Sequence, residues 1–504
     1  MPDLILAIDQ GTTGTTALVL DASGDLKGRG YAPVGQRYPR PGWVEQDPVE
    51  LWQSTLLASA RALESGGIHA RDLLALGITN QRETTLLWER SSGRPVSPAV
   101  VWQCRRTTDI CAALRADGLE PLVRQRTGLL LDPYFSGPKL KWLLDADPHL
   151  RSRAERGELA FGTVDSWLVW NLTGGAAHVT DPSNASRTLL LDLNNVAWDP
   201  ELLRALSIPA DLLPRIVPSS GLVGETVACD PIPAGLPISG LAGDQQAALF
   251  GQRCFARGQA KSTYGTGCFL LVQAGPEPPH PQQGILATIA WQVGAVTAYA
   301  LEGSVFIAGA AVQWLRDELG IISDADETEA LARSVPDAAG ITFVPAFVGL
   351  GAPHWQPDAR GAIVGITRGA SRAHLARAAL EAIAHQVVDV VEAMQAGGPP
   401  LTELRVDGGA AKNGFLMQFQ ADLLGLPVIR PRLLETTALG AALLAGLGIG
   451  LYRSTAELSE LQPPDRIFRP EATAHDRLRW RNEWQRAVAC ALAWAMGAPS
   501  EIAQ

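Results

Sequence analysis

The sequence predicts an α/β protein made of two related domains with a ligand held between them. Three observations support this prediction. The chain has 504 residues, which is too long for a single hydrophobic core. Strand-like apolar runs alternate with segments of helical apolar spacing through most of its length. A pattern of strand, Gly/Thr turn and strand occurs near the start and again at mid-chain.

The expected elements follow from apolar periodicity and from the Gly, Pro and polar residues between the runs. Strands are predicted at residues 4–8, 17–20, 73–78, 85–88, 341–344 and 404–406. Helices are predicted at residues 48–65, 138–144, 372–394 and 415–424. Residues 438–452 are rich in Ala and Gly and too short for a bilayer of about 20 residues, so we expect a tightly packed core helix.

The repeated hairpin is the strongest evidence for two domains. LILAIDQGTTGTTALVLDASG, residues 4–24, resembles AKSTYGTGCFLLVQAG, residues 260–275. Each pattern is that of a β-hairpin whose turn is rich in backbone amides and hydroxyls. We therefore expect a duplicated domain, with the boundary near residue 250 and the domains at residues 1–250 and 251–504.

Composition and charge exclude several classes of partner. The chain is 46% hydrophobic and 19% charged, as in ordinary globular proteins. Its net charge of -10 gives no electrostatic reason to expect nucleic acid or an anionic membrane. The six cysteines contain no CxxC pair, and no signal peptide or membrane span is visible. We expect a reduced, cytoplasmic protein.

The turn of the first hairpin has the character of a phosphate site. Gly11 allows close approach of the backbone, and Thr12 and Thr13 add hydroxyl donors. Asp9 would repel a phosphate unless a cation lay between them, so we expect it to hold Mg²⁺ directly or through water. The alternative is a tight hairpin in which Asp9 binds its own turn amides. The second hairpin favours the nucleotide interpretation.

A third Gly-rich segment, LRVDGGAAKN at residues 404–413, places a turn between a strand and a helix beginning near Asn413 or Gly414. Gly turns and helix N-termini accommodate phosphates and flat rings. Taken alone, this segment is more typical of a plain turn than of a ligand site.

Together these segments resemble the FGGY family of carbohydrate kinases and, within it, the glycerol kinases. The resemblance covers nearly the whole chain. The motifs that carry it are DQGTT, GWVEQDP, GITNQRETT, VWQCRRT, YFSGPKLKWL, FGTVDSWL, NASRT, GDQQAALFGQ, TYGTGCF, PAFVGLGAPHW, VDGGA and ETTALGAALLAG.

The resemblance implies two actin-like (ribonuclease-H-like) ATPase domains with a catalytic cleft between them. It implies phosphorylation of glycerol by ATP with Mg²⁺, giving sn-glycerol 3-phosphate for glycerol catabolism and lipid synthesis. Relatives are usually homodimers or homotetramers. Two alternatives stay open: a kinase for another small polyol or ketose, such as dihydroxyacetone or erythritol, and a non-catalytic actin-like nucleotide switch.

The resemblance also assigns the substrate site. It makes Asp244 the general base, which fits the need of a poorly nucleophilic alcohol for a positioned proton acceptor. The other expected glycerol ligands are Arg82, Glu83, Tyr134 and Gln245 for the hydroxyls, and Trp102 and Phe269 for the carbon chain. Without the resemblance, the Arg82–Glu83 pair could be a surface ion pair, and Asp244 could cap the helix that follows it.

On the nucleotide side, the resemblance implies contacts from residues of both hairpins and of the third Gly-rich segment. They are Thr12, Thr13, Gly14, Thr16, Thr266, Gly309, Gln313, Ala410 and Gly414. Three of these depart from the family pattern: Gly14 replaces a Ser, Thr16 an Arg and Gly414 an Asn. Loss of the Arg cation should weaken phosphate binding by about 1–3 kcal/mol.

Overall fold

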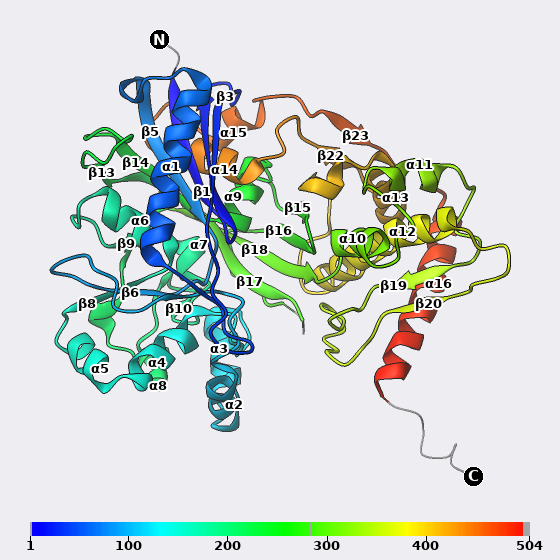
Figure 1. Ribbon diagram of the computed structural model, residues 1–504, viewed down its shortest axis with the longest axis horizontal. Helices are drawn as coiled ribbons and strands as arrows, with labels where there is room; N and C mark the ends of the chain where they lie inside the picture. The colour runs from blue at the N-terminus through cyan, green and yellow to red at the C-terminus, as the bar shows by residue number, and fades with distance from the viewer. Residues whose placement is uncertain (1–2, 282–283, 497–504) are drawn as a thin grey trace.

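The computed structural model describes residues 3–281 and 284–496, which form an α/β structure around a sheet of 13 strands (Figure 1). From edge to edge, the strands are β3 (Leu26–Pro33), β2 (Gly14–Asp21), β1 (Leu4–Gln10), β5 (Leu73–Asn80), β14 (Pro237–Gly243), β13 (Ser220–Glu225), β17 (Leu286–Val293), β18 (Val296–Val305), β16 (Cys268–Gly275), β15 (Gln259–Tyr264), β21 (Glu403–Asp407), β22 (Val428–Arg430) and β23 (Arg466–Phe468).

The two halves of this sheet have the same strand order. In the first half, β1, β2 and β3 form an antiparallel meander, and β5 and β14 continue the sheet parallel to β1. In the second half, β15, β16 and β18 form the meander, and β21 and β22 continue parallel to β15. Both predicted hairpins are thus present, β1–β2 and β15–β16, and the predicted fold class is confirmed.

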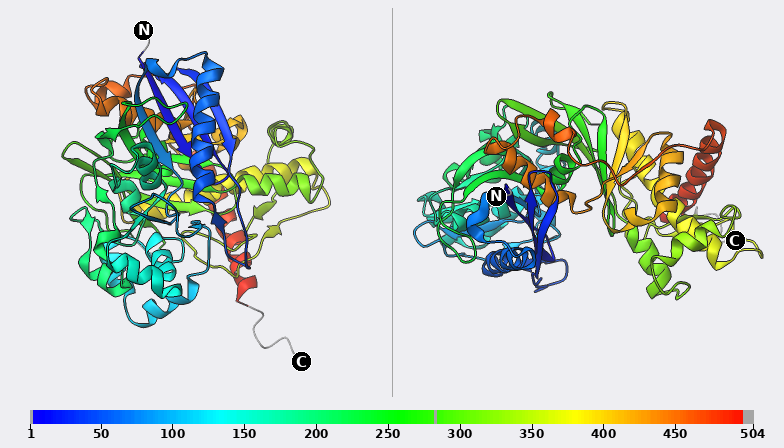
Figure 2. Two further views of the ribbon diagram at one scale, coloured as in Figure 1. Left: turned by 60° about the vertical axis from the view of Figure 1, so that its left-hand side comes forward. Right: turned by 90° about the horizontal axis from the view of Figure 1, so that it is seen from above.

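The halves meet through β13 and β17, which are joined by one parallel pairing, Ser220 with Val293. Seen from above, the two halves lie side by side, with the N-terminal strands in one and the C-terminal helix in the other (Figure 2). Short two-stranded ladders outside the main sheet involve β4 (Glu45–Gln46), β6 (Leu86–Glu89), β7 (Ala99–Val100), β8 (Leu159–Gly162), β9 (Val179–Thr180), β10 (Leu191–Asp192), β11 (Ala197–Trp198), β12 (Arg215–Ile216), β19 (Thr342–Val344) and β20 (Ala362–Val364).

Helices cover both faces of the sheet and form the outer parts of each half. They are α1 (Pro48–Gly66), α2 (Thr108–Ala116), α3 (Glu120–Thr127), α4 (Ser136–Ala146), α5 (Pro148–Glu155), α6 (Val164–Leu172), α7 (Pro182–Ala185), α8 (Pro200–Leu206), α9 (Asp244–Gly251), α10 (Gly309–Asp317), α11 (Glu327–Arg333), α12 (Arg372–Gln395), α13 (Gly414–Leu424), α14 (Thr436–Gly448), α15 (Thr455–Ser459) and α16 (Ala474–Ala495). The predicted helices at 48–65, 138–144, 372–394 and 415–424 correspond to α1, α4, α12 and α13.

The predicted core helix at residues 438–452 is shorter than expected. It corresponds to α14, which ends at Gly448. The chain then turns at Gly450, which has a φ of +78°, a left-handed conformation that glycine adopts without steric strain. The Leu451 amide donates back to the Gly446 carbonyl at 2.8 Å. Apolar composition alone did not reveal this turn.

Helix α14 follows β22 in the chain but packs on the first half of the sheet, beside β1, β5 and β14, and against α9 (Figure 1). The approach is close because glycines line it. A Cβ on Gly440 would lie 1.8 Å from the Ala247 carbonyl oxygen, and one on Gly251 would lie 2.0 Å from the Thr436 carbonyl oxygen. Backbone atoms cannot yield as side chains can, so this crossing fixes the position of α9.

Across residues 3–281 and 284–496, no helix is both long enough and apolar enough to cross a membrane.

We predict that Gly440→Ala lowers the free energy of unfolding by about 3 kcal/mol, because the added methyl group would overlap the α9 backbone. Urea unfolding followed by tryptophan fluorescence measures this change. Gly369→Ala is the control, because its Cβ would meet only the Thr367 hydroxyl at 3.9 Å. Equal stability of the two variants would contradict the proposed crossing constraint.

Candidate active site

Polar residues gather where three neighbouring parallel strands end. Asp9 lies near the end of β1, Arg82 and Glu83 follow β5, and Asp244 follows β14. Since β1 and β14 both pair in parallel with β5, their carboxyl ends lie at one edge of the sheet. The strand order therefore brings together residues separated by more than 200 positions in the sequence.

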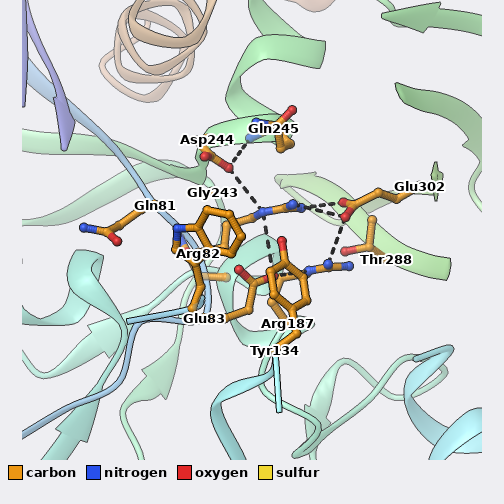
Figure 3. Close-up of polar contacts among 12 residues, drawn as sticks. Gln81, Arg82, Glu83, Tyr134, Arg187, Gly243, Asp244, Gln245, Thr288 and Glu302 are labelled. Carbon is orange, nitrogen blue, oxygen red and sulfur yellow. Dashed lines mark hydrogen bonds and ion pairs between the residues drawn. The ribbon is translucent and has the colours of Figure 1, made fainter. Parts of the chain in front are cut away.

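Arg82 is the centre of this group (Figure 3). Its Nε lies 3.2 Å from Asp244 Oδ1, and its Nη2 donates to Glu302 Oε1 at 3.1 Å. Arg82 is 3% exposed and Glu83 is 1% exposed, so the alternative of a surface ion pair is wrong. Burial by itself lowers the pKa of Arg82, but Glu302 and Glu83 raise it well above its usual value, and the guanidinium stays charged.

Glu83 is held in an uncommon backbone conformation. Its φ is +60°, a region that costs a non-glycine residue about 1–3 kcal/mol. Its backbone carbonyl accepts from Ser136 Oγ at 3.1 Å and from Lys139 Nζ at 3.3 Å. Its Oε1 accepts from Arg187 Nε at 2.7 Å. The surrounding contacts thus fix the Glu83 carboxylate beside Arg82, in the arrangement that a rigid hydroxyl ligand requires.

Sequence reasoning did not assign Glu302 or Arg187. Arg187 Nη2 donates to Glu302 Oε1 at 2.9 Å, so Glu302 joins Arg187 to Arg82. Although burial raises the pKa of Glu302, Arg187 and then Arg82 outweigh it and lower that pKa to about 2. The signal available in the sequence was a carboxylate within the otherwise apolar strand β18.

Aromatic residues connect this group to the first hairpin. The Tyr134 ring lies edge-on to Trp102, with ring centroids 5.6 Å apart. Trp102 Nε1 in turn donates to Thr12 Oγ1 at 2.9 Å. Phe269, in contrast, lies half-buried on β16 opposite Thr263, and within the described residues it forms no aromatic pair.

Asp244 is the first residue of α9, and Gly243 occupies the N-cap position, so the alternative of Asp244 as a helix cap is wrong. Asp244 Oδ1 accepts from the Gln245 amide at 2.6 Å as well as facing Arg82. Within the described part of the chain, Oδ2 makes no hydrogen bond to protein. Oδ1 is thus fixed by two donors at a helix N-terminus, and Oδ2 is left able to accept a proton.

Asp9 lies half-buried near this carboxylate. Desolvation, and second the charge of Asp244, raise the pKa of Asp9 to about 7. Two carboxylates that repel each other in this way suit a cation between them. Among the described residues no cluster of three or more His, Cys, Asp or Glu side chains could hold a metal. A Mg²⁺ ion here would therefore take most of its ligands from phosphate oxygens and water, as this ion usually does.

The first hairpin turn presents exposed and half-buried residues. Thr13 is exposed, and Thr12 and Thr16 are half-buried. A Cβ on Gly14 would lie 2.4 Å from the Tyr31 hydroxyl, which donates to the Thr13 carbonyl at 3.2 Å. The Tyr31 side chain thus occupies the space that a serine at position 14 would need, which gives a physical reason for that departure.

The remaining expected nucleotide residues lie in the second half. Thr266 is exposed in the β15–β16 turn, and its carbonyl accepts from the Ala308 amide at 2.8 Å, just before α10. Helix α10 begins at Gly309 and carries the exposed Gln313. A Cβ on Gly309 would lie 2.6 Å from the Gly265 carbonyl oxygen, so only glycine allows this approach.

Ala410 lies half-buried in a short 3₁₀ helix, Gly409–Lys412, that follows β21. A Cβ on Gly408 would lie 2.6 Å from the Tyr264 carbonyl oxygen, so this turn packs directly on the second hairpin. The Gly414 amide donates to Glu329 Oε2 at 2.8 Å. Asn413 caps α13 by accepting from the Leu416 amide at 2.9 Å, so its side chain is already engaged beside Gly414.

Comparison with known proteins identifies relatives over the whole described fold. The profile of the FGGY family of carbohydrate kinases, N-terminal domain, matches residues 4–251, and that of the C-terminal domain matches residues 260–449. A glycerol kinase of Dechloromonas aromatica (strain RCB) is 58% identical over 492 residues, covering 97% of this chain and 98% of that protein. Glycerol kinase 2 of Thermotoga maritima is 54% identical over 491 residues, covering 97% and 99%.

Solved structures give the same result. The crystal structure of Plasmodium falciparum glycerol kinase with ADP superposes with a TM-score of 0.91 at 34% identity, covering 97% of this chain and 98% of that chain. A xylulose kinase from Rhodospirillum rubrum superposes with a TM-score of 0.87 at 23% identity, covering 98% and 100%, and shows the shared fold alone.

We predict that Glu302→Gln lowers the free energy of unfolding at pH 7 by about 3–5 kcal/mol, because it leaves two buried guanidinium groups undercompensated. The folded-state pKa of about 2 lies below the ordinary value of 4.5, so this contribution is present above pH 4.5 and is lost as the pH falls toward 2. The stability difference from wild type should therefore shrink by about 1 kcal/mol between pH 7 and pH 3.5.

Urea unfolding at both pH values measures these differences. Glu120→Gln is the control, because its ion pair with Arg115 lies at the surface and should change stability by less than about 0.5 kcal/mol. A Glu302→Gln variant as stable as this control would contradict the network.

Proposed function

The chain belongs to the FGGY family of carbohydrate kinases, and we propose that it transfers the γ-phosphoryl group of ATP to glycerol, giving sn-glycerol 3-phosphate and ADP. The identities of 54–58% to curated glycerol kinases over 97% of the chain support this activity. The observation that carries it structurally is the buried Arg82 guanidinium, which binds the Asp244 carboxylate and lies beside Glu83. A polyol needs such a set of paired donors and acceptors.

In the proposed reaction, Arg82 donates to glycerol hydroxyl oxygens and Glu83 accepts from hydroxyl hydrogens. Tyr134 contributes a further contact to the hydroxyls, and the Trp102 and Phe269 rings cover the carbon chain and exclude water. Asp244 Oδ2 takes the proton of the terminal glycerol hydroxyl while the oxygen of that hydroxyl forms a bond to the γ-phosphorus. The bond between that phosphorus and the β–γ bridging oxygen breaks, and ADP leaves. Arg82 and the Gln245 amide hold Asp244 Oδ1 in place before the transfer.

The nucleotide phosphates are proposed to bind between the two hairpin turns, near Thr12, Thr13 and Thr266. The base and ribose would lie toward Gly309, Gln313, Ala410 and Gly414 in the second half. Asp9 would hold Mg²⁺ directly or through water, and the ion supplies neutralisation of phosphate charge. Thr16 provides no cation in place of the expected Arg, so the proposed phosphate site is weaker by about 1–3 kcal/mol.

The two alternatives are less favoured. A kinase for another small polyol or ketose would share this fold, but the curated relatives at 54–58% identity are glycerol kinases. A nucleotide switch without catalysis would have no use for the buried Arg82–Glu83 pair, nor for Asp244 beside it, whose Oδ2 makes no hydrogen bond to the described part of the protein. We further propose the division into domains near residue 250, a cytoplasmic location and a homodimer or homotetramer.

We predict that Asp244→Asn lowers kcat by about 10²–10⁴-fold, because the amide can still accept from Arg82 but can no longer take a proton. The KM for glycerol should change by less than about threefold. Steady-state kinetics coupled to ADP release measure both values. Asp145→Asn, which alters an exposed ion pair on α4, is the control. Retained turnover in Asp244→Asn would remove Asp244 from the role of base.

We predict that Asp9→Asn raises the Mg²⁺ concentration needed for half-maximal activity by about tenfold or more, because the metal loses its anionic ligand. The raised pKa of about 7 means that folding penalises the ionised carboxylate, so the metal-free variant should also be more stable than wild type at pH 8. Metal titration of activity and urea unfolding in EDTA measure the two effects. An unchanged Mg²⁺ requirement would exclude Asp9 as the ligand.

A further inference from the structure

Lys261 is a charged residue with no role so far, although it is 0% exposed in the middle of β15. Its Nζ donates to Gln245 Oε1 on α9 and to Thr263 Oγ1 at 3.0 Å on its own strand. Strand β15 leads directly into the turn that carries Thr266. The side chain therefore joins an expected glycerol ligand of the first half to the second hairpin.

Carboxylates lie around Lys261 but only partly offset the effect of its burial. Burial lowers the pKa of Lys261 below its ordinary value, and Arg82 lowers it further. Asp407, Asp244 and Glu302 raise it but do not outweigh burial. Asp407 lies directly opposite Thr263 in the β15–β21 register, on the side of the strand facing β21. Lys261 Nζ is the donor in both of its hydrogen bonds, to Gln245 Oε1 and to Thr263 Oγ1.

An ammonium group donates hydrogen bonds and cannot accept them. In the structure the Gln245 side chain turns its carbonyl oxygen toward Lys261, whose Nζ donates to it. Its Nε2 amide group, which can only donate, is then left for the substrate side. A glutamine with an unconstrained amide could present either end, so the lysine removes that ambiguity.

We propose that Lys261 is a positioning residue that orients the Gln245 amide so that it donates to a hydroxyl oxygen of glycerol. This inference rests on the proposed function and deepens it. Hydrogen-bond polarity in the pocket is then divided: Arg82 and Gln245 donate to substrate oxygens, and Glu83 and Asp244 accept the hydroxyl hydrogens. Through Lys261, the orientation of a glycerol ligand depends on the strand that carries the second hairpin turn.

The first test is a double-mutant cycle on the wild-type chain. Lys261→Met keeps the length of the side chain and removes its charge. It should raise the KM for glycerol about tenfold, with kcat and the KM for ATP changed less than about threefold. Gln245→Ala should raise the same KM about tenfold. If the lysine acts through the glutamine, the double variant should show about tenfold rather than a hundredfold increase.

The second test does not depend on removing the buried charge. Gln245→Glu keeps a partner for Lys261 but replaces the donor amide with an acceptor, so it should lose glycerol affinity as strongly as Gln245→Ala. Isothermal titration with glycerol in the absence of ATP measures this loss. Lys27→Met, at a surface ion pair with Asp21, is the control for kinetics and folding.

Multiplicative effects in the cycle, an unchanged glycerol KM in Lys261→Met, or wild-type glycerol affinity in Gln245→Glu would each overturn the inference. Failure of the proposed function has a different result: the wild-type chain would form no phosphorylated glycerol at all. The two failures are therefore distinguishable in the same set of assays.

Discussion

The structure of the site depends on one buried guanidinium. Arg82 follows β5 of the first half, and it is held by Asp244 from the neighbouring strand end and by Glu302 from β18 of the second half. Burying a charge is costly unless partners surround it, so Arg82 can exist here only if both halves contribute carboxylates. Arg187 shares Glu302 and fixes Glu83, and the strained backbone of Glu83 is kept in place by the same network.

Much of the fold could be predicted from the sequence because its signals are local. Both hairpins and the helices at α1, α12 and α13 follow from apolar periodicity and from turn residues adjacent in the chain. Within the site, the positions of Asp9 and Asp244 at strand ends could also be predicted from local apolar runs. Arg82, Glu83 and Tyr134 were assigned to the site through the resemblance to a known family. The proposed roles of these residues remain predictions, and the variants at Asp9 and Asp244 test two of them.

Other features could not be predicted because they depend on contacts between distant segments. Glu302 and Lys261 lie inside strands, where sequence alone gives no partner for a buried charge, although a charge in an apolar strand is itself a signal. The space beside Gly14 is filled by Tyr31 of the neighbouring strand, which only the register of β2 and β3 reveals. The position of α14 likewise follows from tertiary packing, since its glycines meet the backbone of α9.

The packing of α14 has a consequence for how this chain can be divided into fragments. Although the sequence repeats its strand pattern, the layer that shields β1, β5 and β14 on one side is supplied by residues 436–448. A fragment ending near residue 250 would leave that apolar surface of the sheet exposed to solvent. The first half therefore depends on a helix that comes from the other end of the chain, and a fragment meant to reproduce it would have to retain residues 436–448.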